Sequence, residues 1–296
     1  MMPHKINRNT EFTSAKRLLQ ELKSRLGAIN EELAPYQIKL ILEDFVGLTP
    51  SQIRFSDDLD VSREITEKVI RIIEKIEKGT PLARALGYRD FWKDKFYLSE
   101  DTLEPRPDTE TLIEEVLKKH SNTPPKRILD IGTGTGCILL SLLREFPEAT
   151  GVGIDLSKGA CETASLNAEQ LEMKNRAEIR CGNWTDPLKM DEKFDLIVSN
   201  PPYIPSSEIA NLDKNVRNYD PILALDGGKT GLDPYKNLLP KVKNHLVEGG
   251  SIFFEIGINQ DQDLARLAED SNATLIRVTK DLGGVPRVVE ISYGDK

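Results

Sequence analysis

Strand-like and helical segments alternate along the chain after residue 125, and this pattern constrains the fold more than any other feature. The strand-like runs are short, apolar and bounded by turn residues, and they span 127–131, 149–154, 177–181, 194–199, 251–256, 274–278 and 287–292. Apolar residues at helical spacing separate several of these runs. The pattern predicts an α/β fold with a Rossmann-like, doubly wound, seven-stranded sheet that is mostly parallel.

The segment before this alternation is predicted to be a small helical domain. Four stretches between residues 11 and 78 carry apolar residues at helical spacing, and glycines that suit helix ends follow three of them. Aromatic residues then alternate with charged ones around Phe91 and Trp92, as in a β-hairpin. We therefore expect a helical bundle at 1–86, which is the candidate for substrate recognition, and a hairpin linker at 87–107.

The α/β domain is expected to occupy residues 108–296. Its first helix carries Leu112 and Val116 on one apolar face. Asp108 and Thr109 precede that face, and both are residue types that cap helix N-termini. One of these two side chains is therefore predicted to cap the helix.

The net charge of the 296-residue chain is −8, and it is unevenly distributed. Residues 1–100 carry 17 Lys and Arg against 16 Asp and Glu, a net charge of +1, so residues 101–296 carry 23 against 32, a net charge of −9. Proteins that bind nucleic acid usually have a basic surface. The acidic second part of the chain favours a small molecule or a basic protein as its partner.

The sequence predicts neither a membrane span nor a metal site. No apolar run approaches the roughly 20 residues that a spanning helix needs, and Met1–Asn7 lacks the apolar core of a signal peptide. The three cysteines, Cys137, Cys161 and Cys181, form no CxxC motif, and there are only three histidines. We expect a reducing, cytoplasmic location and no bound metal.

A glycine-rich loop follows the first predicted strand and opens a helix. It consists of Gly132, Thr133, Gly134, Thr135 and Gly136. Glycines at such a loop let the backbone turn tightly and approach a ligand closely. The spacing differs from the GxGxxG pattern of NAD-binding proteins, and the preceding Asp130 would face a cationic or amine-bearing ligand. NAD is the competing cofactor, but S-adenosylmethionine, which carries an amino-acid group, suits the loop better.

Two further candidate cofactor residues follow the next two strands. Asp155 ends the second strand, where a carboxylate can accept both ribose hydroxyls of a nucleoside. The alternative role for Asp155 is to cap the following helix. Trp184 follows the third strand and could stack on an adenine ring, and its alternative role is that of a packing aromatic.

The fourth strand ends in Asn200, Pro201, Pro202 and Tyr203. Prolines have no backbone N–H and a fixed φ, so the strand cannot continue and the turn is stiff. The carboxyl ends of parallel strands are where open α/β sheets bind ligands. An amide side chain, free carbonyl groups and an aromatic ring at this edge indicate chemistry on a planar amine or amide nitrogen.

The glycine loop, Asp155 and the Asn-Pro-Pro-Tyr motif, in this order, resemble class I S-adenosylmethionine-dependent methyltransferases that modify planar nitrogens. Other motifs resemble the release-factor glutamine methyltransferases, the PrmC/HemK family. These motifs are Pro81-Leu82-Ala83, Gly87-Tyr88-Arg89, Phe91-Trp92, Pro105-Arg106-Pro107-Asp108-Thr109-Glu110, Ala224-Leu225-Asp226-Gly227-Gly228 and Gly231-Leu232. The resemblance covers nearly the whole chain, although in the helical domain it rests on pattern alone.

The resemblance implies a specific reaction. A methyl group would pass from S-adenosylmethionine to the N5 amide nitrogen of the glutamine in the GGQ motif of class 1 peptide chain release factors, a modification linked to translation termination. Cofactor contacts would fall on Gly132 to Gly136, Asp155, Trp184 and Asn200. Substrate contacts would fall on Asn200 to Tyr203, with Asn200, Pro201 and Tyr203 as catalytic residues. A monomer is expected, with no direct contact to nucleic acid or membrane.

Two other functions stay open from the sequence. A nucleic-acid adenine-N6 methyltransferase would use the same corner after flipping a base, and an interaction protein could carry a degenerate cofactor fold. The chain also departs from the family pattern at two places. Glu104 stands where an apolar residue is common, and the segment 283–287 differs near the last hairpin, where we expect it not to touch the chemistry.

Overall fold

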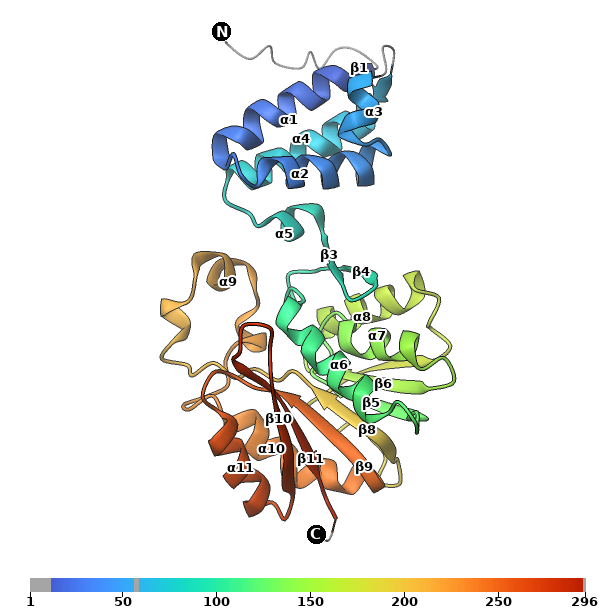
Figure 1. Ribbon diagram of the computed structural model, residues 1–296, viewed down its shortest axis with the longest axis vertical. Coiled ribbons are helices and arrows are strands. Elements are labelled where there is room, and N and C mark those ends of the chain that lie inside the picture. Colours follow the sequence, from blue (N-terminus) through green and yellow to red (C-terminus); the bar gives the residue numbers. More distant parts are fainter. Residues whose placement is uncertain (1–11, 56–58, 295–296) are drawn as a thin grey trace. The chain divides into compact units, whose positions relative to one another are not determined.

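The computed structural model describes residues 12–55 and 59–294 and divides into two compact units, one ending at Gly87 and the other beginning at Tyr88 (Figure 1). We call them the helical unit and the sheet unit. The expected lack of a signal peptide concerns Met1–Asn7, which lie outside the described residues. Among the described residues, no helix is long and apolar enough to cross a membrane.

The helical unit is held by an apolar core. Its elements are β1 (Phe12–Ser14), α1 (Ala15–Ile29), α2 (Ala34–Ile41), a π-helical turn at Leu42–Val46, α3 (Pro50–Phe55), β2 (Asp60–Ser62), α4 (Arg63–Glu77) and α5 (Leu82–Leu86). Leu22 of α1 and Ile73 of α4 are fully buried in this core. The Ser62 hydroxyl accepts a hydrogen bond from the Ile65 N–H and caps α4. The helices expected from the apolar spacing correspond to α1 to α4.

The sheet unit begins with a β-hairpin and continues as alternating strands and helices. The hairpin pairs β3 (Tyr88–Phe91) with β4 (Asp94–Tyr97). The strands that follow are β5 (Arg127–Ile131), β6 (Thr150–Asp155), β7 (Ala177–Cys181), β8 (Phe194–Ser199), β9 (Leu246–Glu255), β10 (Thr274–Lys280) and β11 (Pro286–Ser292). The helices are α6 (Glu110–Lys119), α7 (Cys137–Glu145), α8 (Lys158–Gln170), α9 (Lys214–Tyr219), α10 (Asp233–Val242) and α11 (Asp261–Asp270).

The seven-stranded, mostly parallel sheet predicted from the sequence is confirmed. Its strand order is β10-β11-β9-β8-β5-β6-β7. The strands from β5 to β9 pair in parallel, whereas β11 runs antiparallel to both of its neighbours. Because β5 to β8 are parallel, their carboxyl ends meet at one edge of the sheet.

Helices cover both faces of the sheet (Figure 1). One apolar core joins α6, α7 and α8 to the sheet. The other joins α10 and α11 to the opposite face, with Tyr235 and Phe254 fully buried. The sheet is therefore shielded from water on both sides, as in doubly wound folds.

One expected boundary differs from the structure. The helix α10 ends at Val242, and a 3-10 turn at Lys243–His245 leads into β9. β9 begins at Leu246 rather than at residue 251, because Phe194 of β8 already pairs with Leu246 before a register shift. Pairing with a neighbouring strand therefore extends β9 through Gly249 and Gly250, whose residue type signals a turn when only the sequence is known.

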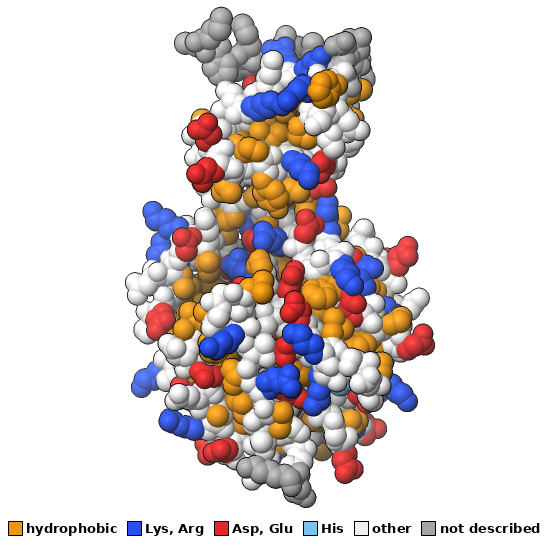
Figure 2. All heavy atoms as spheres, viewed as in Figure 1, with side chains coloured by type: hydrophobic (Ala, Val, Ile, Leu, Met, Phe, Trp, Pro, Cys, Tyr) orange, Lys and Arg blue, Asp and Glu red, His pale blue; other side chains and the backbone are white. Residues whose placement is uncertain are grey.

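The charges of the sheet unit are mixed on the face that Figure 2 shows. Lys and Arg side chains stand among Asp and Glu side chains there, and no single basic field covers the described surface of this unit in that view. Ion pairs such as Lys118–Glu115, 2.7 Å, and Lys119–Glu290, 2.6 Å, account for part of this mixing.

Candidate active site

A pocket of about 570 Å³ opens at the edge where β5, β6, β7 and β8 end. All of the residues that line it belong to the sheet unit. Those predicted from the sequence are Gly132, Thr133, Gly134, Thr135, Asp155, Trp184, Asn200 and Pro202. Segments that are far apart in the chain therefore converge on one cavity, as the parallel arrangement of the strands requires.

The glycine loop takes a conformation that other residues would strain. Gly132, Gly134 and Gly136 have φ angles of 74°, 56° and 80°, in the left-handed region. The N–H groups of Gly132 and Thr133 both donate to the Ile154 carbonyl, at 2.8 and 2.9 Å. These bonds tie the loop to the carboxyl end of β6.

Asp155 accepts a hydrogen bond from the glycine loop with one carboxylate oxygen and one from the turn before α8 with the other. Its Oδ2 accepts a hydrogen bond from the Gly134 N–H at 2.8 Å, and its Oδ1 accepts one from the Ser157 N–H at 2.9 Å. Burial raises the pKa of this carboxyl, although these backbone hydrogen bonds act against the rise. The side chain that caps α8 is Ser157, which accepts from the Ala160 N–H. Asp155 is therefore not the cap, and its carboxylate faces the pocket.

Asp130 does not line the pocket, contrary to expectation. It is fully buried beneath the glycine loop, and its Oδ2 accepts a hydrogen bond from the Thr133 hydroxyl at 2.7 Å. Burial raises the pKa of Asp130 to about 7. This carboxyl orders the loop from below, because it fixes the side chain of Thr133.

The Asn200–Tyr203 corner is braced on both sides. The Ser199 hydroxyl, just before it, donates to the Ile131 carbonyl at 2.5 Å and ties β8 to β5. After the corner, Ile204 and Asp226 form an isolated parallel bridge. The corner also adjoins the glycine loop, since a Cβ on Gly132 would lie 4.0 Å from the Asn200 carbonyl oxygen.

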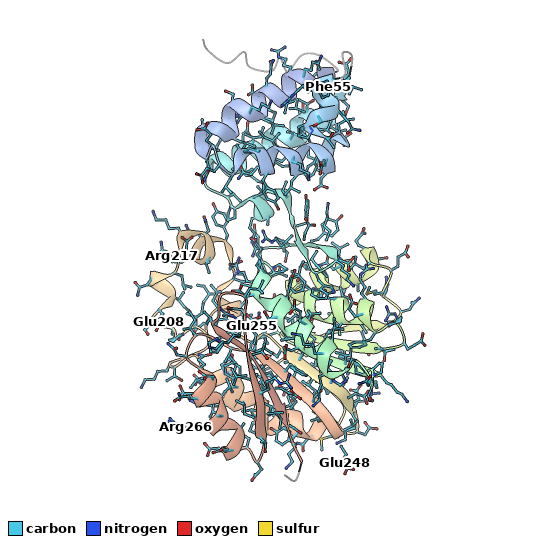
Figure 3. All side chains as sticks on the ribbon, viewed as in Figure 1. Phe55, Glu208, Arg217, Glu248, Glu255 and Arg266 are labelled. Carbon is cyan, nitrogen blue, oxygen red and sulfur yellow. A yellow bond between two sulfur atoms is a disulfide. The ribbon has the colours of Figure 1, made fainter. Side chains whose placement is uncertain are left out.

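Tyr203 points away from the pocket lining and toward a buried carboxylate. Its hydroxyl donates to Glu255 Oε1 at 3.3 Å, and its ring packs against the core that contains α10 and α11. Figure 3 shows Glu255 inside the sheet unit, whereas Glu208 and Arg266 project at its periphery. Burial raises the pKa of Glu255 to about 7, with hydrogen bonding to Thr109 acting against the rise.

Three of the predicted site residues do not line the pocket: Gly136, Pro201 and Tyr203. Gly136 instead precedes α7 and packs close to Leu140 and Ala164. Trp184 does line the pocket, with a φ of 50° that is rare for a bulky residue, and it also packs against the apolar core. Both roles considered for Trp184 are therefore compatible with its position.

Sequence reasoning did not assign site roles to several residues that line the pocket. They come from the segment after the hairpin, from the loop before α10 and from the first turns of α10: Asp101, Leu103, Pro105, Arg106, Thr109, Ile222, Leu223, Ala224, Asp226, Gly227, Gly228, Asp233, Pro234 and Asn237. The signal was present in part, because the family-like motifs at 105–110 and 224–228 contain half of these residues.

One expectation near the site was wrong. Neither Asp108 nor Thr109 caps α6, since that helix has no side-chain cap and a 3-10 turn at Pro107–Thr109 precedes it. In the segment 283–287, Arg287 forms ion pairs with Asp281 at 3.1 Å and Asp108 at 3.5 Å, and none of these three residues lines the pocket. Glu104, the other departure, forms an ion pair with Arg89 at 3.4 Å.

The Cys161 and Cys181 side chains meet, a contact that the sequence did not predict. Their Cα atoms are 6.0 Å apart, and the contact lies between α8 and the end of β7. Cys137 is free, and burial raises the pKa of its thiol to about 12. Among the described residues, no group of three or more His, Cys, Asp or Glu side chains could hold a metal ion.

The fold and the site together define a class of protein. A seven-stranded doubly wound sheet, a glycine loop after its first strand and a carboxylate after the next are the features of a class I S-adenosylmethionine-dependent methyltransferase. The chain matches a model described as "Methyltransferase small domain" over residues 105–216 and one described as "PrmC N-terminal domain" over residues 17–87.

Relatives with similar sequences narrow the class. A release factor glutamine methyltransferase of Rhodospirillum rubrum is 41% identical over 271 residues, which cover 92% of this chain and 82% of the relative. One of Bradyrhizobium diazoefficiens is 41% identical over 277 residues, which cover 90% and 91%. The chain belongs to the release factor glutamine methyltransferase family.

A solved structure supports the fold. The catalytic domain of hMettl16 in complex with MAT2A 3′UTR hairpin 1 superposes with a TM-score of 0.55 at 15% sequence identity, covering 78% of this chain and 81% of that one. At this identity the likeness concerns the fold alone.

The residues of the pocket fit S-adenosylmethionine, the cofactor of this class. The left-handed Gly132 and Gly134 expose backbone at the cavity wall, where a side chain would take up room. The Asp155 carboxylate provides the acceptor that a ribose needs, and the Trp184 ring provides an apolar surface.

Proposed function

We propose that this protein transfers a methyl group from S-adenosylmethionine to the side-chain amide nitrogen, N5, of the glutamine in the GGQ motif of class 1 peptide chain release factors. The observation that carries the proposal is the position of Asn200, which lines the same pocket as the glycine loop and Asp155. A nitrogen held by Asn200 would therefore lie in the cofactor pocket. Membership of the release factor glutamine methyltransferase family supports the same substrate.

Asn200 and Pro201 provide the acceptors that an amide substrate needs. The Asn200 Oδ1 and the Pro201 carbonyl oxygen accept the two N–H groups of the glutamine amide. Holding both hydrogens fixes the plane of the amide and leaves one face of its nitrogen open toward the cofactor pocket. Tyr203 supports the corner from behind through its hydrogen bond to Glu255.

S-adenosylmethionine supplies an electrophilic methyl group on its sulfonium when it is bound. An amide nitrogen is a poor nucleophile, because its lone pair is delocalised into the carbonyl group. The contribution of the protein is therefore to orient the amide, which can lower a barrier by about 7–11 kcal/mol in well-positioned systems. An amide nitrogen that has gained a methyl group is strongly acidic, so its proton leaves without a strong base.

The finer parts of the proposal concern the partner. The helical unit is the candidate for binding the release factor, with residues 1–86 as the recognition domain and 87–107 as the linker. Action on a release factor assigns the enzyme to translation termination in the cytoplasm, and we propose that it acts as a monomer. Nucleic acid is not expected as a substrate, since acidic residues are in excess at 101–296.

The test is a methyl-transfer assay with labelled S-adenosylmethionine. A class 1 release factor, duplex DNA and no substrate are compared, and a release factor with Ala in place of the GGQ glutamine is the matched control. Label is expected only on the release factor that keeps its GGQ glutamine. Label on DNA, or on the control release factor, would overturn the proposal.

A further inference from the structure

The Asn200–Tyr203 corner is held in different ways at its two ends. On the strand side, β8 pairs with β5 and with β9. Within the corner, Pro201 and Pro202 have no N–H groups, so neither can donate a backbone hydrogen bond. The position of the Pro201 carbonyl, which the proposed reaction uses, therefore depends on what holds the chain at Tyr203.

Gln260 holds the Tyr203 carbonyl. Its Nε2 donates to the Tyr203 carbonyl oxygen at 3.0 Å, across 57 positions of the chain, and to the Gly231 carbonyl oxygen at 3.3 Å. Its Oε1 accepts a hydrogen bond from the Gly257 N–H at 2.9 Å. One side chain thus joins the corner, the turn before α10 and the segment between β9 and α11.

The orientation of the Gln260 amide is determined by its partners. All three are backbone groups, namely two carbonyl oxygens, which only accept, and one N–H, which only donates. The NH2 group must therefore face Tyr203 and Gly231, and the amide oxygen must face Gly257. Turning the amide over would break all three hydrogen bonds.

Gln260 is buried at the start of a helix without capping it. It directly precedes α11, yet its side chain makes no cap hydrogen bond to that helix. It is 8% exposed and does not line the pocket. The backbone on both sides packs closely against it, because a Cβ on Gly231 would lie 2.7 Å from Nε2 and a Cβ on Gly257 would lie 3.0 Å from Oε1. The side chain therefore serves the corner and the turn before α10 rather than the helix.

We propose that Gln260 is a positioning residue for methyl transfer: it holds the Tyr203 carbonyl and thereby fixes the two acceptors of the corner that bind the glutamine amide. The two prolines transmit a shift at Tyr203 to these acceptors, because φ is fixed at both of them. A displacement of about 1 Å near the reacting groups can cost about 100-fold in rate. The inference rests on the proposed function.

The first test removes the donor and compares two replacements. Gln260→Glu keeps an oxygen for the Gly257 N–H, but at about pH 8.5 its carboxylate has no proton for the two carbonyl oxygens. Gln260→Met has a similar length and makes none of the three hydrogen bonds. Both variants should lower kcat per folded enzyme by roughly tenfold to a hundredfold. Gln262→Glu, the same change at an exposed residue of α11, is the matched control and should keep full kcat.

Protonation should rescue the glutamate variant alone. Burial beside two carbonyl oxygens raises the pKa of a carboxyl. As the pH falls from about 8.5 to about 6, the carboxyl of Gln260→Glu gains a proton and can donate to the Tyr203 carbonyl. The kcat of Gln260→Glu divided by that of Gln260→Met should therefore rise roughly tenfold over this range. If Gln260 only stabilised the fold, the folded fraction would change and this ratio, taken per folded enzyme, would stay constant.

The native ionisable groups on the neighbouring segments do not disturb this ratio. They include Tyr203, Lys229, Asp233, Glu255, Asp261 and, on β11, Arg287, which donates to the Ile256 carbonyl. Glu255 titrates within the range, because burial raises its pKa to about 7. Both variants contain all of these groups unchanged, so their titration cancels when one variant is divided by the other.

The outcomes separate this inference from the proposed function. A wild type that fails to methylate a release factor would remove both. With an active wild type, full kcat per folded enzyme in Gln260→Met, or a ratio that does not change with pH, would overturn the positioning role alone. A loss of kcat in Gln262→Glu as large as that in Gln260→Glu would also overturn it.

Discussion

The helical unit and the sheet unit bury different kinds of side chain. In the described part of the helical unit, the buried polar side chains are two threonines, Thr13 and Thr66. The sheet unit buries several carboxylates, of which Asp130 and Glu255 have pKa values raised to about 7 by burial. Burying a charge without full compensation costs folding energy. The difference indicates that the core of the helical unit serves packing alone, whereas that of the sheet unit also serves chemistry.

The largest effect is expected when the corner of the sheet unit loses its amide. Asn200→Ala should lower turnover by about 100-fold or more, because the substrate amide is no longer held in one orientation. The melting temperature should change little, as Asn200 is only partly buried. Turnover would be measured with labelled S-adenosylmethionine, and a value near that of the wild type would remove Asn200 from the mechanism.

A core substitution in the helical unit should lower stability and leave cofactor binding unchanged. Leu22→Ala removes a fully buried side chain and should destabilise this unit by about 3 kcal/mol. Binding of S-adenosylhomocysteine should be unaffected, because every pocket residue lies between 101 and 237. Chemical unfolding and calorimetry check the two parts, with Leu33→Ala, at a half-exposed leucine, as the control. A large loss of cofactor affinity in Leu22→Ala would contradict the division of roles.

The same substitution can be made in both units at glycines with nearly equal φ angles. Gly47 of the helical unit has a φ of 73° and open space around a Cβ, whereas Gly231 has a φ of 75° and its Cβ would lie 2.2 Å from the Tyr203 carbonyl oxygen. Gly47→Ala should cost about 1 kcal/mol of backbone strain. Gly231→Ala should cost about 2 kcal/mol more, from overpacking, and should lower turnover. If Gly47→Ala and Gly231→Ala lost the same stability and the same activity, the close contact between Gly231 and Tyr203 would have no role.

Asp155 should contribute to cofactor affinity rather than to the fold of the sheet unit as a whole. Asp155→Ala should weaken the binding of S-adenosylhomocysteine by about tenfold to a hundredfold, the range for losing charge-assisted hydrogen bonds. Isothermal titration calorimetry measures the change, and Asp270→Ala at the exposed end of α11 is the control. Unchanged affinity would leave Asp155 only its backbone contacts to Gly134 and Ser157.

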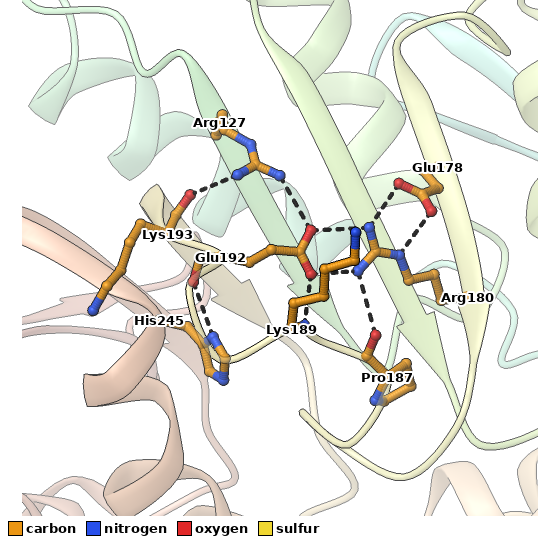
Figure 4. A network of polar contacts seen from close by, with 8 residues as sticks. All are labelled: Arg127, Glu178, Arg180, Pro187, Lys189, Glu192, Lys193 and His245. Carbon is orange, nitrogen blue, oxygen red and sulfur yellow. Dashed lines mark hydrogen bonds and ion pairs between the residues drawn. The ribbon is translucent and has the colours of Figure 1, made fainter.

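The smallest loss of stability is expected from Glu192 of the sheet unit, whose carboxylate is paired with arginines (Figure 4). Glu192 accepts hydrogen bonds from Arg180 at 2.7 and 3.0 Å and from Arg127 at 3.4 Å, and the bond to Arg180 is the main cause that lowers its pKa to about 2. Glu192→Gln should destabilise the unit by about 1 kcal/mol at pH 7. Glu248→Gln, at an exposed glutamate, is the control.

The pH dependence of this effect follows from the sign of the shift. A carboxyl with a lowered pKa stabilises the fold above the pKa of the unfolded chain and loses this contribution as the pH falls. The stability difference between wild type and Glu192→Gln should therefore be full above about pH 5 and shrink toward pH 2, as followed by urea unfolding. A difference that grows toward low pH would contradict the ion-pair role.

Much of the fold was predictable because its signals are local. Buried parallel strands are continuous apolar runs, and the apolar spacing of helices is visible within about a dozen residues. The glycine loop and the Asn200–Tyr203 corner are also local motifs, and the parallel sheet brings them together without further information.

The rest of the site depends on contacts between distant parts of the chain. Thr109 and Asn200 are 91 positions apart in the sequence, and the hydrogen bond between their side chains joins two separate motifs. The residues around Thr109 predicted a helix cap, since the competing partner Asn200 could not be seen from the local sequence. The contact between Cys161 and Cys181 was missed for the same reason, because it depends on how α8 packs against the end of β7.

Pro201, Pro202 and Gly231 determine when the Asn200–Tyr203 corner loses its conformational entropy. Pro201 and Pro202 have little freedom even in the unfolded chain, and Gly231 lies against Tyr203 once the chain has folded. The conformational entropy of this turn is therefore lost once, at folding, rather than each time a substrate binds. A substrate loop that arrives disordered meets a surface that is already ordered, so its own ordering is the main entropic cost of each catalytic cycle.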